Sequence, residues 1–133
     1  MTGHGWVGSG TNLYLFTGIG GVGGASLLWA FSTTNSSWAQ LADGPIRFQS
    51  YMCFGASGGL IYLLGGNSTF SYIPADNAWT EHTGSVTVEG GNQGPRYGGA
   101  LLDVGGELLL VHGSDTNTGI AQMPPRFLCS NVV

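Results

Sequence analysis

Two arginines recur in one short motif of this sequence. Arg47 lies in GPIRF (44–48) and Arg96 in GPRY (94–97), in a chain of 133 residues that has only three lysines and arginines in total. A guanidinium forms paired hydrogen bonds with carboxylates, and it also donates to backbone carbonyls. The first chemistry predicts that both arginines bind an acidic peptide, and the second predicts that each braces a junction between structural units. The sequence leaves both interpretations open.

Signals for a cofactor or a metal are weak. Residues 18–23 have the form GxGxxG, but a dinucleotide site needs a helix directly afterwards. The next residues, ASLLWAFSTTNSSW (25–38), alternate as a strand does, so a loop is the better interpretation. Metal-ligand spacing is absent among the histidines, which are His4, His82 and His112. We therefore predict no cofactor and no metal.

Signals for hydrolytic chemistry are equally weak. The sequence contains no GxSxG nucleophile motif, and its carboxylates are isolated. The nearest two, Asp103 and Glu107, flank an expected turn, and nothing else in the sequence supports a glycosidase pair there. We predict that the chain is not an enzyme and has no catalytic residue.

The amino-acid composition narrows the possible classes of function further. Hydrophobic residues make up 42% of the chain and charged residues 8%, with a net charge of −4. A core is therefore expected, and nucleic-acid binding is not, because three dispersed cations cannot follow a phosphate backbone. No signal peptide or membrane-spanning run is visible, so we expect no membrane association; an intracellular location is favoured, although the compartment is unknown.

The elements that must position these residues repeat along the chain. LYLFTG, IYLLGG and LLLVHG begin at residues 13, 61 and 108, so they recur every 47 or 48 residues. Such a period indicates stacked units that bury their faces against one another. Short apolar runs separated by glycine pairs predict four strands in each unit. The expected strands are 3–9, 12–17, 26–32 and 37–41 in the first unit, 49–56, 60–65, 69–74 and 78–82 in the second, and 97–104 and 107–112 in the third.

The order of motifs in each unit resembles the kelch repeat of β-propellers. An apolar strand ends in glycine, an aromatic residue and a tryptophan follow, and a proline precedes Arg-aromatic. The second unit carries this pattern best, the first has Thr17 in place of a glycine, and the third has no tryptophan after His112. The residues that carry the resemblance, and to which it assigns structural roles, are Gly18, Phe31, Trp38, Gly65, Gly66, Tyr72, Trp79 and Gly113.

The resemblance implies an all-β fold, a fragment of a kelch-type β-propeller. Its blades would span about 1–46 and 47–95, followed by a partial third blade over 96–113 and an atypical tail over 114–133. The tryptophans would fill the space between adjacent sheets. So few blades cannot close a ring, so we expect a fragment, an aberrant gene product, or copies that associate through open blade edges.

A protein-binding scaffold is the function that this resemblance favours. Loops at one end of the sheets would bind a protein or peptide, and an acidic peptide is one expected partner. The residues expected to contact it are Arg47, Arg96, Tyr51, Tyr97, Asn67 and Asp115. The alternative is a fragment of a kelch-propeller enzyme, of the carbohydrate oxidase or specifier type, whose active site would lie in blades that this chain lacks.

Overall fold

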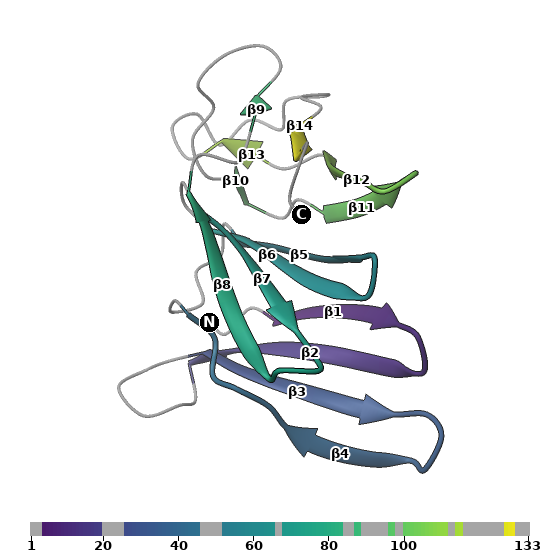
Figure 1. Ribbon diagram of the computed structural model, residues 1–133. Helices are drawn as coiled ribbons and strands as arrows, with labels where there is room; N and C mark the ends of the chain where they lie inside the picture. Colours follow the sequence, from purple (N-terminus) through teal and green to yellow (C-terminus); the bar gives the residue numbers. More distant parts are fainter. Residues whose placement is uncertain are drawn as a thin grey trace.

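The computed structural model describes residues 4–19, 26–45, 52–65, 68–83, 87–88, 96–97, 100–111, 114–115 and 127–129. These residues form strands and turns, with no helix among them, so the prediction of an all-β fold is confirmed. No helix of the described part has the length and hydropathy needed to cross a membrane. Figure 1 shows the strands gathered into sheets that stack face to face.

Two sheets are antiparallel meanders whose strands lie side by side in chain order. Sheet 1 contains β1 (His4–Ser9), β2 (Asn12–Ile19), β3 (Ser26–Ser32) and β4 (Ser37–Gln40). Sheet 2 contains β5 (Met52–Ser57), β6 (Leu60–Gly65), β7 (Ser68–Ile73) and β8 (Ala78–Thr83). All eight strands expected for the first two units are therefore present, with small differences at their ends.

The third sheet differs from the expectation. Only β11 (Ala100–Val104) and β12 (Glu107–Val111) were anticipated, but the sheet has the order β11-β12-β14-β9. The other two strands are β14 (Phe127–Cys129) and β9 (Thr87–Val88), which come from segments on either side of the third unit. The free edge of β12 needs hydrogen-bond partners, and β14 provides them, while β9 pairs in turn with β14. A separate two-stranded ladder pairs β10 (Arg96–Tyr97) with β13 (Ser114–Asp115).

Sheets 1 and 2 pack through one face of each. Alternation along a strand sends every second side chain to this interface, as with Tyr14 and Phe16 of β2. Leu13 of the same strand is 42% exposed on the other face, so β2 is buried on one face, whereas β6 has buried residues on both faces. The fully or nearly buried residues of this core are Tyr14, Phe16, Leu28, Ile61, Leu63, Phe70 and Tyr72.

The sheets approach one another most closely at their first strands. A Cβ added at Gly5 of β1 would lie 3.0 Å from the Cβ of Phe54 in β5, and one added at Gly55 of β5 would lie 2.6 Å from the Cβ of Leu101 in β11. Cys53 and Tyr62 of sheet 2 and Leu101 and Leu108 of sheet 3 form a second, smaller core. The stack is therefore continuous from sheet 1 to sheet 3.

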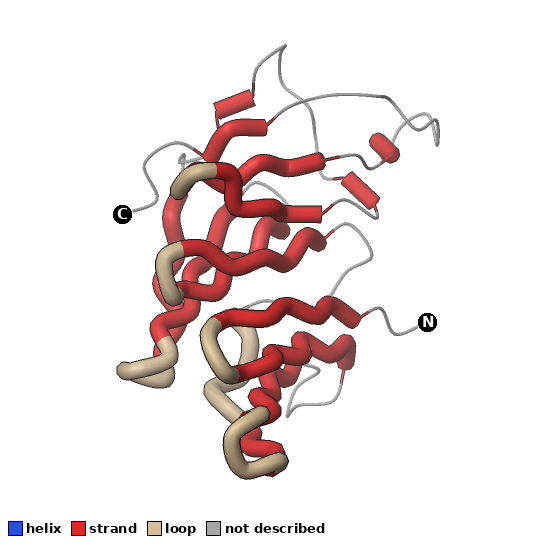
Figure 2. Tube along the Cα trace, turned by 90° about the vertical axis from the view of Figure 1, so that its right-hand side faces the viewer, coloured by secondary structure: helices blue, strands red, loops and turns tan. Residues whose placement is uncertain are grey.

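The hairpin turns of the three sheets lie along one side of the molecule, as the tan segments of Figure 2 show. The turns Gly58–Gly59 and Gly105–Gly106 have positive φ at both glycines, which L side chains rarely adopt. Because the strands are antiparallel, β2 ends and β3 begins at the opposite side, as do β4 and β5 or β6 and β7. The connections between those strands therefore start and finish away from the hairpin turns.

Candidate functional site

A segment of the first unit is held by hydrogen bonds from the second. Residues 41–45 follow β4, and within them Ala42 donates its N–H to Asn77 Oδ1 at 2.8 Å. The indole Nε1 of Trp79 donates to Ala42 O at 3.3 Å. Backbone bonds from Leu41 and Gly44 to β3 run beside these contacts. The chain that leads towards Arg47 is thus positioned by both sheets, although Arg47 itself lies outside the described residues.

The two tryptophans of the repeat have different environments. Trp79 lies between the sheets, where its ring centroid is 6.0 Å from that of Phe16 in sheet 1 and 5.3 Å from that of Tyr72. Trp38 is 50% exposed and contacts Phe31 of its own sheet, at a centroid distance of 5.1 Å. Only Trp79 therefore fills a space between sheets within the described structure.

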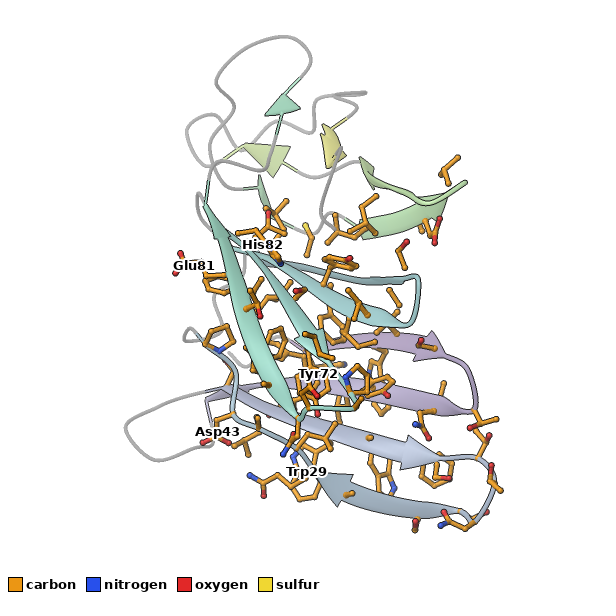
Figure 3. All side chains as sticks on the ribbon, viewed as in Figure 1. Trp29, Asp43, Tyr72, Glu81 and His82 are labelled. Atoms are coloured by element: carbon orange, nitrogen blue, oxygen red, sulfur yellow. The ribbon has the colours of Figure 1, made fainter. Side chains whose placement is uncertain are left out.

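Tyr72 is the central polar group of the interface between sheets 1 and 2, where Figure 3 places it. Its ring is fully buried, and its hydroxyl donates to Asn77 Oδ1 at 2.7 Å. Burial raises the pKa of Tyr72 above that of a free tyrosine, and the nearby Tyr14 hydroxyl adds to the shift. The phenol is thus held neutral as a hydrogen-bond donor.

This shift predicts an alkaline loss of stability. The pKa of Tyr72 is raised in the folded state, so its contribution is fully present below the unfolded pKa of about 10 and is lost as pH rises through the folded value. We expect Tyr72→Phe to lower the free energy of unfolding by about 1 kcal/mol at pH 7 and to make its fall above pH 10 shallower. Urea unfolding at a series of pH values measures both effects; an unchanged alkaline slope would contradict the assignment.

Three of the predicted binding residues come together in one short ladder. The register of β10 and β13 places Arg96 opposite Asp115, and Tyr97 opposite Ser114. Asp115 is therefore placed as a neighbour of Arg96. The remaining candidates, Tyr51 and Asn67, lie outside the described residues together with Arg47.

The motif glycines are described in part. The pairing of β2 with β3 shifts register between Thr17 and Ile19, so Gly18 lies at a β-bulge. Glycine is common at such irregularities because it tolerates unusual backbone geometry. Gly65 is the last residue of β6 and pairs with Met52 and Ser68. Gly66 and Gly113 are not among the described residues.

A serine–histidine hydrogen bond is present in sheet 2. Ser71 Oγ and His82 Nε2 are 2.7 Å apart, on the face that turns towards sheet 3. Ser71 is only 3% exposed, so its hydroxyl has little access to a substrate. Glu81 leaves β8 on the opposite face from His82, as Figure 3 shows, so it is not placed as the acid of a triad. This geometry is that of a buried polar contact that sequence spacing did not reveal.

Asp103 does not have the properties of a catalytic acid. It is exposed, as expected, and hydrogen bonds from the Ser57 hydroxyl and the Gly106 N–H lower its pKa. A glycosidase acid needs a raised pKa, so this shift has the opposite sign. Within the described residues, no three histidine, cysteine, aspartate or glutamate side chains are grouped so as to hold a metal ion.

The chain matches no protein-family model. No curated protein matches it either. Among solved structures it is similar to the one described as "Structure of YjhT", with a TM-score of 0.64 and 17% sequence identity. The similarity covers 84% of this chain and 34% of YjhT, so the chain spans about a third of that protein's length. At this identity the comparison supports a shared fold and carries no information on activity.

Proposed function

We propose that this chain is a non-catalytic protein-binding module built from kelch-type propeller blades. The blade assignment is supported by the register, which repeats from sheet to sheet: Leu13, Phe31 and Trp38 lie opposite one another in sheet 1, as Ile61, Tyr72 and Trp79 do in sheet 2. The close approach of the first strands is also what a radial arrangement of sheets requires.

The observation that carries the binding function is that the connections between strands fall on two opposite sides of the molecule. Hairpin turns occupy one side, and the connections that carry Arg47, Tyr51 and Asn67 begin and end at the other. Binding residues commonly lie on loops that a rigid scaffold positions. The hydrogen bonds that Ala42 donates to Asn77 and accepts from Trp79 provide such support just before Arg47.

The expected ligand is an acidic peptide. Arginine pairs with carboxylates through two parallel hydrogen bonds, and tyrosine adds apolar contact area beside it. Peptides of equal length and acidic, neutral or basic composition, titrated by fluorescence polarisation, test this expectation. Acidic peptides should bind best, and binding should weaken with added salt.

Substitution of the arginines tests the residues themselves. Arg47→Ala and Arg96→Ala should each weaken acidic-peptide binding about tenfold, which corresponds to about 1.4 kcal/mol. Arg126→Ala removes the same charge at PPRF (124–127), an arginine outside the predicted binding set, and is the control. An equal loss in all three variants would leave only a net-charge effect, and lost hydrogen-exchange protection in β4 or β5 would indicate a bracing role instead.

A further inference from the structure

The large exposed apolar side chains of the described residues lie on the two outward faces of the stack. Trp6, Leu13 and Trp38 are 53%, 42% and 50% exposed on sheet 1, and Leu102 and Val104 are 49% and 57% exposed on sheet 3. In both sheets the register places them on the side opposite the cores shared with sheet 2. Extended apolar patches on soluble proteins commonly mark interaction sites.

The outward face of sheet 1, called the front face, is rich in aromatic rings. Trp6 on β1 and Trp38 on β4 meet across the two central strands, with centroids 6.1 Å apart. Trp29 leaves the same side of the sheet, away from sheet 2 (Figure 3). The apolar residues that the register places on this face are Trp6, Leu13, Leu15, Leu27, Trp29, Phe31 and Trp38.

The front face has the composition of a face that another sheet covers. Leu13 and Phe31 hold the same register positions as Ile61 and Tyr72 of sheet 2. Ile61 and Tyr72 are fully buried because sheet 1 lies over them, whereas Leu13 has no sheet above it within the described structure. The front face therefore has the same kind of surface as the face of sheet 2 that packs against sheet 1.

The outward face of sheet 3, called the back face, corresponds to the faces that pack onto a front face elsewhere in the stack. One position of the first strand is equivalent in the three units and is occupied by Val7, Gly55 and Leu102. Each of these residues pairs with the corresponding residue of the second strand of its sheet. Val7 belongs to the face with which sheet 1 covers sheet 2, and Gly55 to the face that meets sheet 3. Leu102 and Val104 thus lie on the surface type that covers a front face.

We infer that the front face of one copy binds the back face of a second copy, head to tail. The described residues of each copy present one face of each type, and their union continues the packing already seen between sheets 1 and 2 and between sheets 2 and 3. The contact is heterologous, so it either closes into a ring or extends.

Two paired variants test this contact by sedimentation velocity over a range of concentrations. The front variant is Trp6→Glu with Trp38→Glu, and the back variant is Leu102→Glu with Val104→Glu. Thr34→Glu, in the exposed turn between β3 and β4, is the charge control. The unmodified chain and the control should form species of two or more copies. Each paired variant alone should need at least about a hundredfold higher concentration, because the contact would bury a charge.

Mixing the variants distinguishes the head-to-tail arrangement from others. Each variant retains one intact face, so an equimolar mixture should form a complex of two copies and nothing larger. Association of the unmodified chain should also shift tryptophan emission to shorter wavelength, since three of its four tryptophans lie on the front face. An unmodified chain that stays monomeric at hundreds of micromolar, or a back variant that associates normally on its own, would overturn the inference.

Discussion

Replacement of Trp79 by alanine is expected to lower the free energy of unfolding by about 3 kcal/mol, as is typical of large-to-small changes at packed sites. The indole contacts Phe16 of sheet 1 and donates to Ala42 O, so its loss opens the space between the two sheets. Chemical unfolding at a chain concentration too low for self-association measures this effect. Hydrogen exchange should show the loss of protection in both sheets, since the contact joins them.

Trp38→Ala is the matched control for this prediction. Trp38 occupies the equivalent register position in sheet 1 and makes an equivalent contact with Phe31, but it is half exposed. Both substitutions remove a strand-favouring aromatic, so the difference between them isolates the packing between sheets. We expect Trp38→Ala to cost less than about 1 kcal/mol. Equal losses would show that the tryptophans act within their own sheets and would refute the role assigned to Trp79.

The strands of the first two units could be predicted from the sequence because their signals are local. SLLWAFS and STFSYI alternate in polarity, and glycine pairs or polar turns end each run. The two short strands of sheet 3, β14 and β9, could not be predicted in this way. They have only two or three residues each, and β14 is placed by its pairing with the edge of β12. Such a strand depends on a distant partner more than on its own composition.

The sequence also could not predict which of the equivalent residues are buried between sheets and which are exposed. Leu13–Phe31–Trp38 and Ile61–Tyr72–Trp79 have the same register and similar chemistry, yet one set faces outward and the other is packed against a sheet. What differs is the presence of a neighbour, which no local pattern records. Trp6 was missed for this reason, although its spacing of 48 residues from Phe54 marks it as a repeat position.

Of the predicted binding residues, the structure places Arg96, Tyr97 and Asp115 in paired strands. The pairing of β10 with β13 is long-range, and the spacing of motifs did not suggest it. The hydrogen bond from Ala42 to Asn77 was missed as well. It depends on an asparagine that lies 35 residues away in the sequence and adopts a φ of 50°. Asparagine in a turn is a common residue for positive φ, so Asn77 carried a signal for its backbone but none for its partner.

Gly55→Ala is expected to cost about 2 to 3 kcal/mol, at the upper end of overpacking effects. The new Cβ would lie 2.6 Å from Leu101 Cβ and 2.7 Å from Leu101 O. Both atoms belong to the backbone or are fixed to it, so a change of side-chain rotamer cannot relieve the contact. Sheet 3 must therefore move away from sheet 2, and the amides of β11 and β12 should exchange faster in the variant.

Gly8→Ala separates this contact from the general effect of a methyl group in a first strand. Gly8 lies in β1, and its added Cβ would meet only Leu13 Cδ2, at an ordinary 3.7 Å. Because alanine restricts the unfolded chain more than glycine does, Gly8→Ala should be neutral or slightly stabilising. Urea unfolding of both variants, with exchange rates read for each sheet, measures the contrast. If Gly55→Ala left β11 and β12 as protected as before, the close packing of sheet 3 against sheet 2 would be refuted, and with it the continuous stack from which the back face derives its role.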